Sequence, residues 1–330
     1  MADITIAAPG QLEGGSDRLA GFLKMFAGEV ITAYARASVT NGRHIERNIQ
    51  SGKSASFPVF GRAIAQYLKA GANLDNLRQN IPHGEKIINI DGLLTSDALI
   101  FDLDDAMAHF DVRAPYSAQL GEALALARDG AVIAEIAKMV VEDKENLTGL
   151  GKGAILSTAL AAADIGETEV MGTAIFKQLL AIKTALSNNY VPEGERYVYI
   201  KPQALNALIA HKDILNKLYG AALTITEGDN GKVRLLGFDL IECPHLTRGG
   251  ATKNEGVIQG DGHVFPAAYK DSAMFVVAHR STVGTLTLKG LSLEHARRAN
   301  LQADEIIAKY AMGHAGLRPE AAFMGVITKA

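Results

Sequence analysis

The sequence contains a single cysteine, Cys243, among its 330 residues. One thiol excludes an internal disulfide framework and a cysteine-rich zinc site, and it suits a protein made in a reducing cytoplasm. Long apolar runs are also missing, since no stretch approaches the roughly 20 residues that span a membrane. The N-terminal segment MADITIAAPGQLEGG lacks the basic and apolar regions of a signal peptide. We therefore expect neither secretion nor a membrane partner.

Net charge is small as well, at −3, whereas tight nucleic-acid binding depends on clustered lysine and arginine. The charge is unevenly placed along the chain. Residues 1–91 carry ten Lys/Arg and eight Asp/Glu, but residues 92–150 carry four and eleven. Within one compact fold this segregation means little, but between copies of a self-assembling chain it would provide complementary contact surfaces.

One short motif resembles a nucleotide-binding signature. Gly52-Lys53-Ser54 matches the end of a phosphate-binding loop, but the first glycine of that motif is replaced by Arg47. The loop should also open a helix whose N-terminus faces the phosphates. The residues that follow, SASFPVFGR, indicate an extended chain instead. We favour a polar hinge entering an extended arm, with a nucleotide-binding enzyme built on this motif as a rival hypothesis.

Other catalytic patterns are missing from the sequence. It has no H-E-x-x-H zinc motif and no G-x-S-x-G nucleophile elbow. Four acidic residues could in principle hold a divalent cation, but they lack a spaced loop with its glycine, and an interface-facing acidic patch is favoured. These residues are Asp97, Asp102, Asp104 and Asp105. We therefore expect no catalytic site, cofactor or metal, and the chain has the composition of a structural building block.

Hydrophobic periodicity predicts helices over 18–39, 116–146 and 169–189. Residues 51–91 contain two extended segments around a Gly/Asn/Pro-rich excursion, which predicts a long two-stranded projection. Residues 149–154 read as a glycine-rich break. Further strands are expected at 196–200, 232–246, 272–279 and 284–291, a short helix at 203–211, and a partly helical or extended segment at 296–313. Helices and strands without regular alternation indicate the α+β class.

Long collinear stretches of the chain carry a family resemblance. They include FLKMFAGEVITAYARASVT, SGKSASFPVFGR, HGEKIINIDGLLTSDALIFDLDDAMAHFDVR and LEHARRANLQADEIIAKYAMGHAGLRPEAA. From about residue 18 onward, the sequence resembles the major capsid proteins of short-tailed phages (podoviruses) of the coliphage T-seven group. The resemblance implies the HK97-like fold. It assigns 1–50 to an N-terminal arm, 51–91 to an E-loop hairpin, 92–150 to a P-domain with its spine helix at 116–146, 150–275 to an A-domain, and 276–330 to a return into the P-domain.

The same resemblance implies a function for the chain as a virion protein. Copies would assemble in the host cytoplasm as hexamers and pentamers into an icosahedral shell of T=7 type, with a separate scaffolding protein and a portal protein at one vertex. The shell would enclose double-stranded DNA without sequence-specific binding and would expand during packaging, and the resemblance leaves room for a decoration protein. No covalent cross-link between copies is expected. A nanocompartment shell of the same fold is the alternative.

On this interpretation, function lies in contacts between copies. The charge segregation predicts that basic residues of the arm and E-loop pair with acidic residues of a neighbour, and that Gly52 is the hinge where the arm becomes the E-loop. The basic residues are Arg43, Arg47, Lys53 and Arg62, and the acidic ones are Asp97, Asp102, Asp104 and Asp105.

Overall fold

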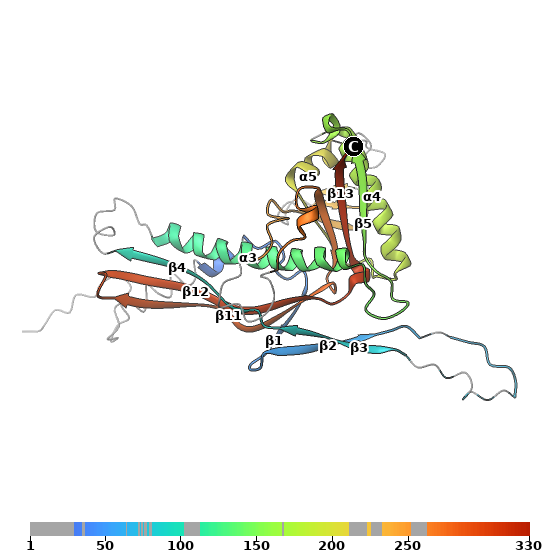
Figure 1. Ribbon diagram of the computed structural model, residues 1–330, viewed down its shortest axis with the longest axis horizontal. Coiled ribbons are helices and arrows are strands. Elements are labelled where there is room, and N and C mark those ends of the chain that lie inside the picture. Colours follow the sequence, from blue (N-terminus) through green and yellow to red (C-terminus); the bar gives the residue numbers. More distant parts are fainter. Residues whose placement is uncertain are drawn as a thin grey trace, which may run out of the picture.

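The computed structural model describes most of the chain, and its elements are shown in Figure 1. The described residues are 30–34, 37–63, 65–71, 73, 75, 78, 81–101, 113–166, 168–210, 223–225, 233–251 and 263–330. No helix within these ranges has the length and apolar character to cross a membrane.

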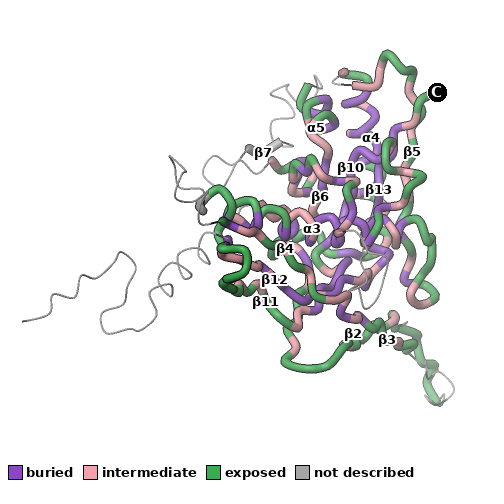
Figure 2. Tube along the Cα trace, turned by 60° about the vertical axis from the view of Figure 1, so that its left-hand side comes forward, coloured by how far each residue is buried: buried purple, intermediate pink, exposed green. Residues whose placement is uncertain are grey.

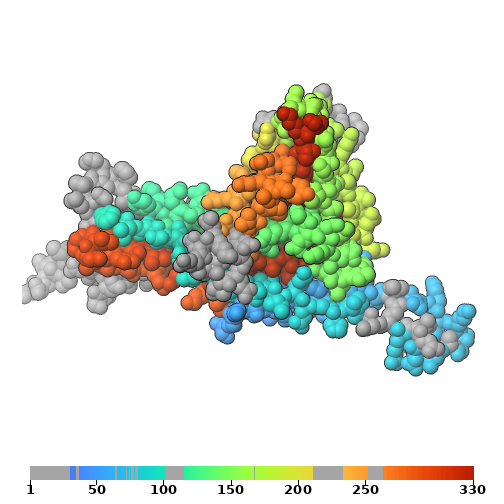
Figure 3. Space-filling model, in the orientation of Figure 1, coloured from blue at the N-terminus to red at the C-terminus, as the bar shows by residue number. Residues whose placement is uncertain are grey.

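Two sheets and a projecting hairpin are arranged around one long helix, α3 (Arg113–Glu142). The smaller sheet has the order β1-β11-β12-β4, formed by Ile45–Asn48, Val283–Arg298, Ala303–Gly316 and Gly92–Phe101. The larger sheet has the order β5-β13-β10-β6-β9-β8-β7, formed by Ala154–Leu160, Ala322–Lys329, Ala273–His279, Arg196–Ile200, Phe238–Glu242, Val233–Leu235 and Leu223–Ile225. In the space-filling view, the smaller sheet forms an elongated limb and the larger sheet stands upright at one end of it (Figure 3).

The N-terminal half of α3 covers the smaller sheet. Leu120 and Leu124 of the helix share a buried cluster with Ile306 and Tyr310 of β12 and Ile100 of β4. With 30 residues at ~1.5 Å each, the helix is about 45 Å long, enough to extend past this sheet.

The C-terminal half of α3 covers one face of the larger sheet. Ile133 and Ile136 lie in a cluster with Val276 of β10. The adjacent residue, Phe275, belongs to a second cluster with helices α4 (Glu169–Asn188) and α5 (Pro202–Ile209). Successive side chains of a strand point to opposite faces of a sheet, so β10 is covered on both sides. Every residue of β10 is accordingly buried, and one helix contributes to the cores beneath both sheets.

Two glycines of α3 mark the points where other backbones approach the helix. A Cβ atom added at Gly121 would lie 2.5 Å from the carbonyl oxygen of Val30, and one at Gly130 would lie 1.7 Å from that of Gly249. Glycine costs about 1 kcal/mol relative to alanine inside a helix. That cost is offset here because no side chain fits between the two backbones.

The predicted two-stranded projection is confirmed. Strands β2 (Ser54–Phe60) and β3 (His83–Asn89) pair antiparallel, from Ser54 opposite Asn89 to Phe60 opposite His83. The hairpin extends below the larger sheet, and much of its surface is exposed (Figures 1 and 2).

The helices expected at 116–146, 169–189 and 203–211 are confirmed as α3, α4 and α5, with small shifts of their ends. The helix expected at 18–39 falls largely outside the described residues, which show it as helical at 30–34. The single strand expected at 232–246 is wrong. Leu236 and Gly237 have φ of 55° and 88°, and they turn the chain back between β8 and β9. Residues 296–313 are extended rather than helical. They comprise the end of β11, the turn at 299–302 and most of β12.

Five strands were not predicted, namely β1, β4, β5, β7 and β13. Strand β13 pairs with β5 and β10, so residues 322–329 belong to the larger sheet. The region 276–330 is therefore divided: β11 and β12 lie in the smaller sheet, and β13 does not.

We expect the close approach at Gly130 to make Gly130→Ala destabilising by about 1–3 kcal/mol, although alanine is the better helix former. Urea unfolding of the full chain measures this. Gly290→Ala on β11 is the matched control because its added methyl group meets no atom within 4 Å. Greater stability of Gly130→Ala would contradict the packing described here.

Candidate assembly surfaces

Three of the basic residues predicted to contact a neighbour lie at the hairpin, namely Arg47, Lys53 and Arg62. Arg47, exposed on β1, donates to the Ser56 carbonyl at 3.1 Å and lies over the Phe57 ring. Arg43 donates to the Val39 carbonyl and lies 5.9 Å from the Tyr197 ring centroid. These two arginines therefore bind carbonyl oxygens and aromatic rings of their own chain.

Lys53 is exposed where the hairpin begins. Among the acidic residues, Asp97 is exposed on β4, opposite Ile307. Asp102, Asp104 and Asp105 lie outside the described residues. Strand β4 runs along the limb away from the hairpin (Figure 1), so the structure does not bring Asp97 together with the basic residues within one chain.

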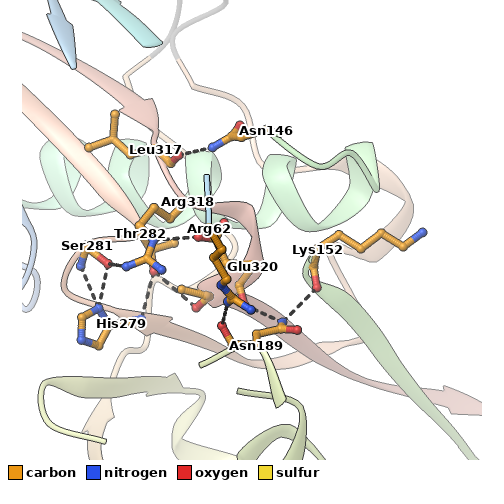
Figure 4. Close-up of polar contacts among 11 residues, drawn as sticks. Arg62, Asn146, Lys152, Asn189, His279, Ser281, Thr282, Leu317, Arg318 and Glu320 are labelled. Atoms are coloured by element: carbon orange, nitrogen blue, oxygen red, sulfur yellow. Dashed lines mark hydrogen bonds and ion pairs between the residues drawn. The ribbon is translucent and has the colours of Figure 1, made fainter. Parts of the chain in front are cut away.

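Arg62, beyond the end of β2, joins the hairpin to the body of its own chain (Figure 4). Its guanidinium donates to the Asn189 carbonyl and lies 4.5 Å from the Tyr190 ring centroid. The Asn189 side chain in turn donates to the Glu320 carbonyl at 2.9 Å. This contact at the end of α4 could not be predicted from the sequence, because the two residues are 127 positions apart.

A cleft of about 420 Å³ separates the hairpin from the body beside this contact. Phe57 and Phe60 line one side, and Leu317 and Glu320 line the other. Glu320 is 2% exposed and accepts a hydrogen bond from Arg318, which also donates to Ser281 (Figure 4). The hairpin is therefore only partly packed against its own chain.

Glycines with positive φ lie where both strands of the hairpin leave the body. Gly52 has φ of 105° and precedes β2, and Gly92 has φ of 150° and follows β3. The space around Gly52 is open, with the Ser54 carbonyl at 4.0 Å as its near contact, so backbone conformation rather than crowding favours glycine there. Ser54 begins a strand and not a helix, which confirms that Gly52-Lys53-Ser54 is not a phosphate-binding loop.

The end of β3 is held firmly on the smaller sheet. Ile88 and Ile90 are buried in a cluster with Leu286 of β11. A Cβ atom at Gly313 of β12 would lie 1.9 Å from the Asn89 carbonyl oxygen. This end of β3 is therefore fixed to the body of the chain.

The N-terminal arm is held on α3 by two adjacent charged residues. Asp129 is fully buried and accepts hydrogen bonds from Ser38 Oγ at 2.7 Å, from Val39 N at 2.6 Å, and from both N and Oγ1 of Thr40. Arg128, also buried, donates to Tyr34 at 2.9 Å and forms an ion pair with Glu46.

The environment of Asp129 keeps it ionised. Burial alone would raise its pKa, but the ring of His245, whose Nε2 lies 3.4 Å from Oδ2 of Asp129, and the hydrogen bonds from residues 38–40 lower it below the ordinary value. Neither Arg128 nor Asp129 was singled out from the sequence. The sequence signal that could have identified them is a charged pair inside the apolar run of a helix (ALARDGAVI).

The exposed end of the β11–β12 ladder carries cross-strand ion pairs. Arg298 donates to both carboxylate oxygens of Glu305, at 2.6 and 2.9 Å, and Arg297 donates to Asp304 at 3.1 Å. These pairs lie within one chain, and exposed pairs of this kind contribute little to stability. The described residues contain no group of His, Cys, Asp and Glu side chains that could hold a metal ion.

Known proteins share both the sequence and the architecture of this chain. Gp10A-like major capsid proteins match residues 56–326. The major capsid protein of Escherichia phage T7 is 51% identical over 319 residues, covering 93% of this chain and 91% of that protein. The major capsid protein of Enterobacteria phage T3 is 49% identical over 333 residues, covering 97% and 95%. The capsid structure of Cyanophage P-SCSP1u superposes with a TM-score of 0.72 at 28% identity, covering 97% of this chain and 98% of that chain.

The two sheets, the long helix and the projecting hairpin thus form the HK97-like fold of phage capsid subunits. The chain belongs to the Gp10A-like family of major capsid proteins. It is a structural protein of the virion shell, where it associates with copies of itself, and it is not an enzyme. The expected fold, family and broad function are confirmed, and the nucleotide-binding and nanocompartment hypotheses are set aside.

We expect Asp129→Asn to destabilise the chain by about 3 kcal/mol at pH 7, because an amide cannot accept from all of its buried donors. The lowered pKa means that this stabilisation is present above the ordinary value of 3.8 and is lost as pH falls through the folded-state pKa. The difference between wild type and variant should therefore shrink in acid. Urea unfolding at pH 7 and pH 3 measures both effects.

Asp271→Asn is the control, since Asp271 is exposed and its substitution should change stability by less than about 0.5 kcal/mol. Equal stability of wild type and Asp129→Asn at pH 7 would show that Asp129 does not anchor the arm.

Proposed function

We propose that this chain assembles as hexamers and pentamers into the icosahedral, T=7-type head shell of a phage, around a separate scaffolding protein and with a portal protein at one vertex. The shell encloses double-stranded DNA without sequence-specific binding and expands during packaging. Membership of the major capsid family supports this proposal, and so does the near-neutral net charge of −3, which does not hold DNA tightly.

The segments fit defined parts of such a subunit. Residues 1–50 act as the arm, and 51–91 as the E-loop. The smaller sheet with α3 acts as the P-domain and its spine. The larger sheet with α4 and α5 acts as the A-domain, to which β13 also contributes.

The exposed hairpin is the observation that carries the proposal. An isolated two-stranded hairpin is marginally stable in water. This hairpin nevertheless exposes large apolar side chains, with Phe60 67% and Ile87 61% exposed. Burial of such surface is the main stabilising contribution in most protein contacts. A neighbouring copy provides the surface against which these side chains are buried.

Charge sets the register of this contact. Arg47 and Lys53 are exposed at the root of the hairpin, and Asp97 is exposed on β4. We propose that the basic set (Arg43, Arg47, Lys53, Arg62) pairs with the acidic set (Asp97, Asp102, Asp104, Asp105) of a neighbour. Arg62 takes part once its bond to Asn189 of its own chain is released. Complementary charges of this kind determine specificity more than affinity.

Charge reversal tests this pairing. We expect Asp104→Lys with Asp105→Lys to reduce the yield of particles at least about tenfold, because like charges then face each other. Adding Arg47→Glu and Lys53→Glu should restore part of the yield. Particles are counted by electron microscopy after coexpression with the scaffolding protein. Lys177→Glu, at an exposed position of α4, is the control. A wild-type yield from the doubly reversed acidic variant would refute the pairing.

Gly52 acts as the hinge of the E-loop in this proposal. Proline fixes φ near −65° and cannot adopt the observed value of 105°. We expect Gly52→Pro to fold and to form unexpanded shells that fail to expand. Gly71→Pro changes another positive-φ glycine, in the excursion between β2 and β3, and should leave expansion intact. Particle radius before and after packaging is the measurement, and wild-type expansion of Gly52→Pro would exclude the hinge.

A further inference from the structure

A buried histidine connects the root of the hairpin to the spine helix. His263 is 8% exposed, and its ring lies between two carboxylates. Its Nδ1 is 2.7 Å from Oε1 of Glu135 on α3, and its Nε2 is 2.7 Å from Oδ2 of Asp91, in the bend between β3 and β4. An ionised carboxylate only accepts hydrogen bonds, and a neutral imidazole has one donor. Both contacts are therefore hydrogen bonds to carboxylates when the ring carries two protons and a positive charge.

The surroundings are consistent with a charged ring. Burial lowers the pKa of His263, but the hydrogen bonds that its ring donates to Asp91 and Glu135, together with their negative charges, outweigh burial and raise the pKa to about 9. Lys138 donates to the same oxygen of Glu135 at 2.9 Å. The ring of His314 on β12 lies edge-on at 5.5 Å, and burial together with the charge of His263 holds its pKa well below the ordinary value. His314 is thus neutral and bonded to Thr285 at 2.9 Å.

Backbone hydrogen bonds hold both Asp91 and His263 in place. The backbone N–H of Asp91 donates to the Met312 carbonyl at 3.1 Å, and that of Ile90 donates to the Lys53 carbonyl at 2.9 Å, which ties together the roots of both hairpin strands. The carbonyl of His263 accepts from Gly250 at 3.0 Å. The loop that contains Gly250 packs on α3 at Gly130. His263 therefore spans the bend from which the hairpin leaves and the helix on which both sheets pack.

We propose that His263 is a protonated clamp that fixes the β3–β4 bend on α3 and so sets the direction in which the hairpin leaves the body. The consequence for shell geometry rests on the proposed role of the hairpin between neighbours, but the clamp itself belongs to the single chain. The folded-state pKa is raised, so the clamp is fully effective below pH 6.5 and is released as pH rises through about 9.

Hydrogen exchange of the full, unassembled chain tests the clamp, with millisecond labelling at pH 6 to 10 and mass spectrometry of peptides that cover residues 84–92. His263→Gln removes the charge but retains a polar side chain. Wild type and variant are compared at the same pH, which cancels the intrinsic pH dependence of exchange. At pH 7 we expect the amides of Ile90 and Asp91 to be at least about tenfold better protected in wild type. By pH 10 the ratio should approach one.

Two further variants make the test specific. Glu135→Gln removes one carboxylate and should move the midpoint of the wild-type step from about pH 9 toward 6.5. His295→Gln, at the exposed end of the β11–β12 ladder, should follow wild type. A protection ratio that is the same at pH 7 and pH 10, or an unchanged midpoint in Glu135→Gln, would overturn the proposal. The midpoint in Glu135→Gln tests the clamp even where His263→Gln does not fold. Both measurements use the unassembled chain, so their outcome does not depend on how copies contact one another.

Discussion

Helix α3 is packed from several sides at once, and the rest of the fold depends on that packing. Its two halves contribute to the cores beneath the two sheets. The backbones at Val30 and Gly249 come so close that only glycine fits at the facing positions of the helix. Between those two positions, Arg128 and Asp129 bind the arm through buried hydrogen bonds. The helix thus fixes the relative positions of elements that are far apart in the sequence.

A rigid centre allows the projecting parts to be exposed without loss of the fold. The hairpin carries apolar side chains in solvent and has a cleft on its inner side. Its root, in contrast, is held by Ile88 and Ile90 in the core and by His263 through Asp91. This combination suits the proposed shell of hexamers and pentamers, in which the same chain would meet neighbours at different angles while its body remains unchanged. The stability of the body and the adaptability of the contacts then depend on separate residues.

The sequence indicated the elements that have strong periodicity. Helices α3, α4 and α5 and the buried strands β6 and β10 follow from their apolar patterns. Strands β4 and β5 escaped prediction because they are only partly buried and lack a continuous apolar run. The sequence pattern predicts one strand in place of β8 and β9, because the turn between them includes Leu236, whose positive φ is uncommon outside glycine. Some of the functional residues could likewise be identified from the sequence, and others could not. Exposed charges near Gly52 were visible in the sequence, but the buried contacts of Asp129 and His263 join residues about 90 to 170 positions apart and require the fold.

We propose that the hairpin and arm of one copy contact the charged limb of another while the packing around α3 stays the same. A cryo-electron microscopy structure of the assembled shell tests it directly. We predict that Arg47 or Lys53 lies within about 4 Å of a carboxylate from residues 97–105 of a neighbour, and that Phe60 and Ile87 are buried there. We also predict that the contacts of Arg128 and Asp129 are unchanged. A shell in which the hairpin packs only on its own chain, or in which the arm has left α3, would contradict this claim.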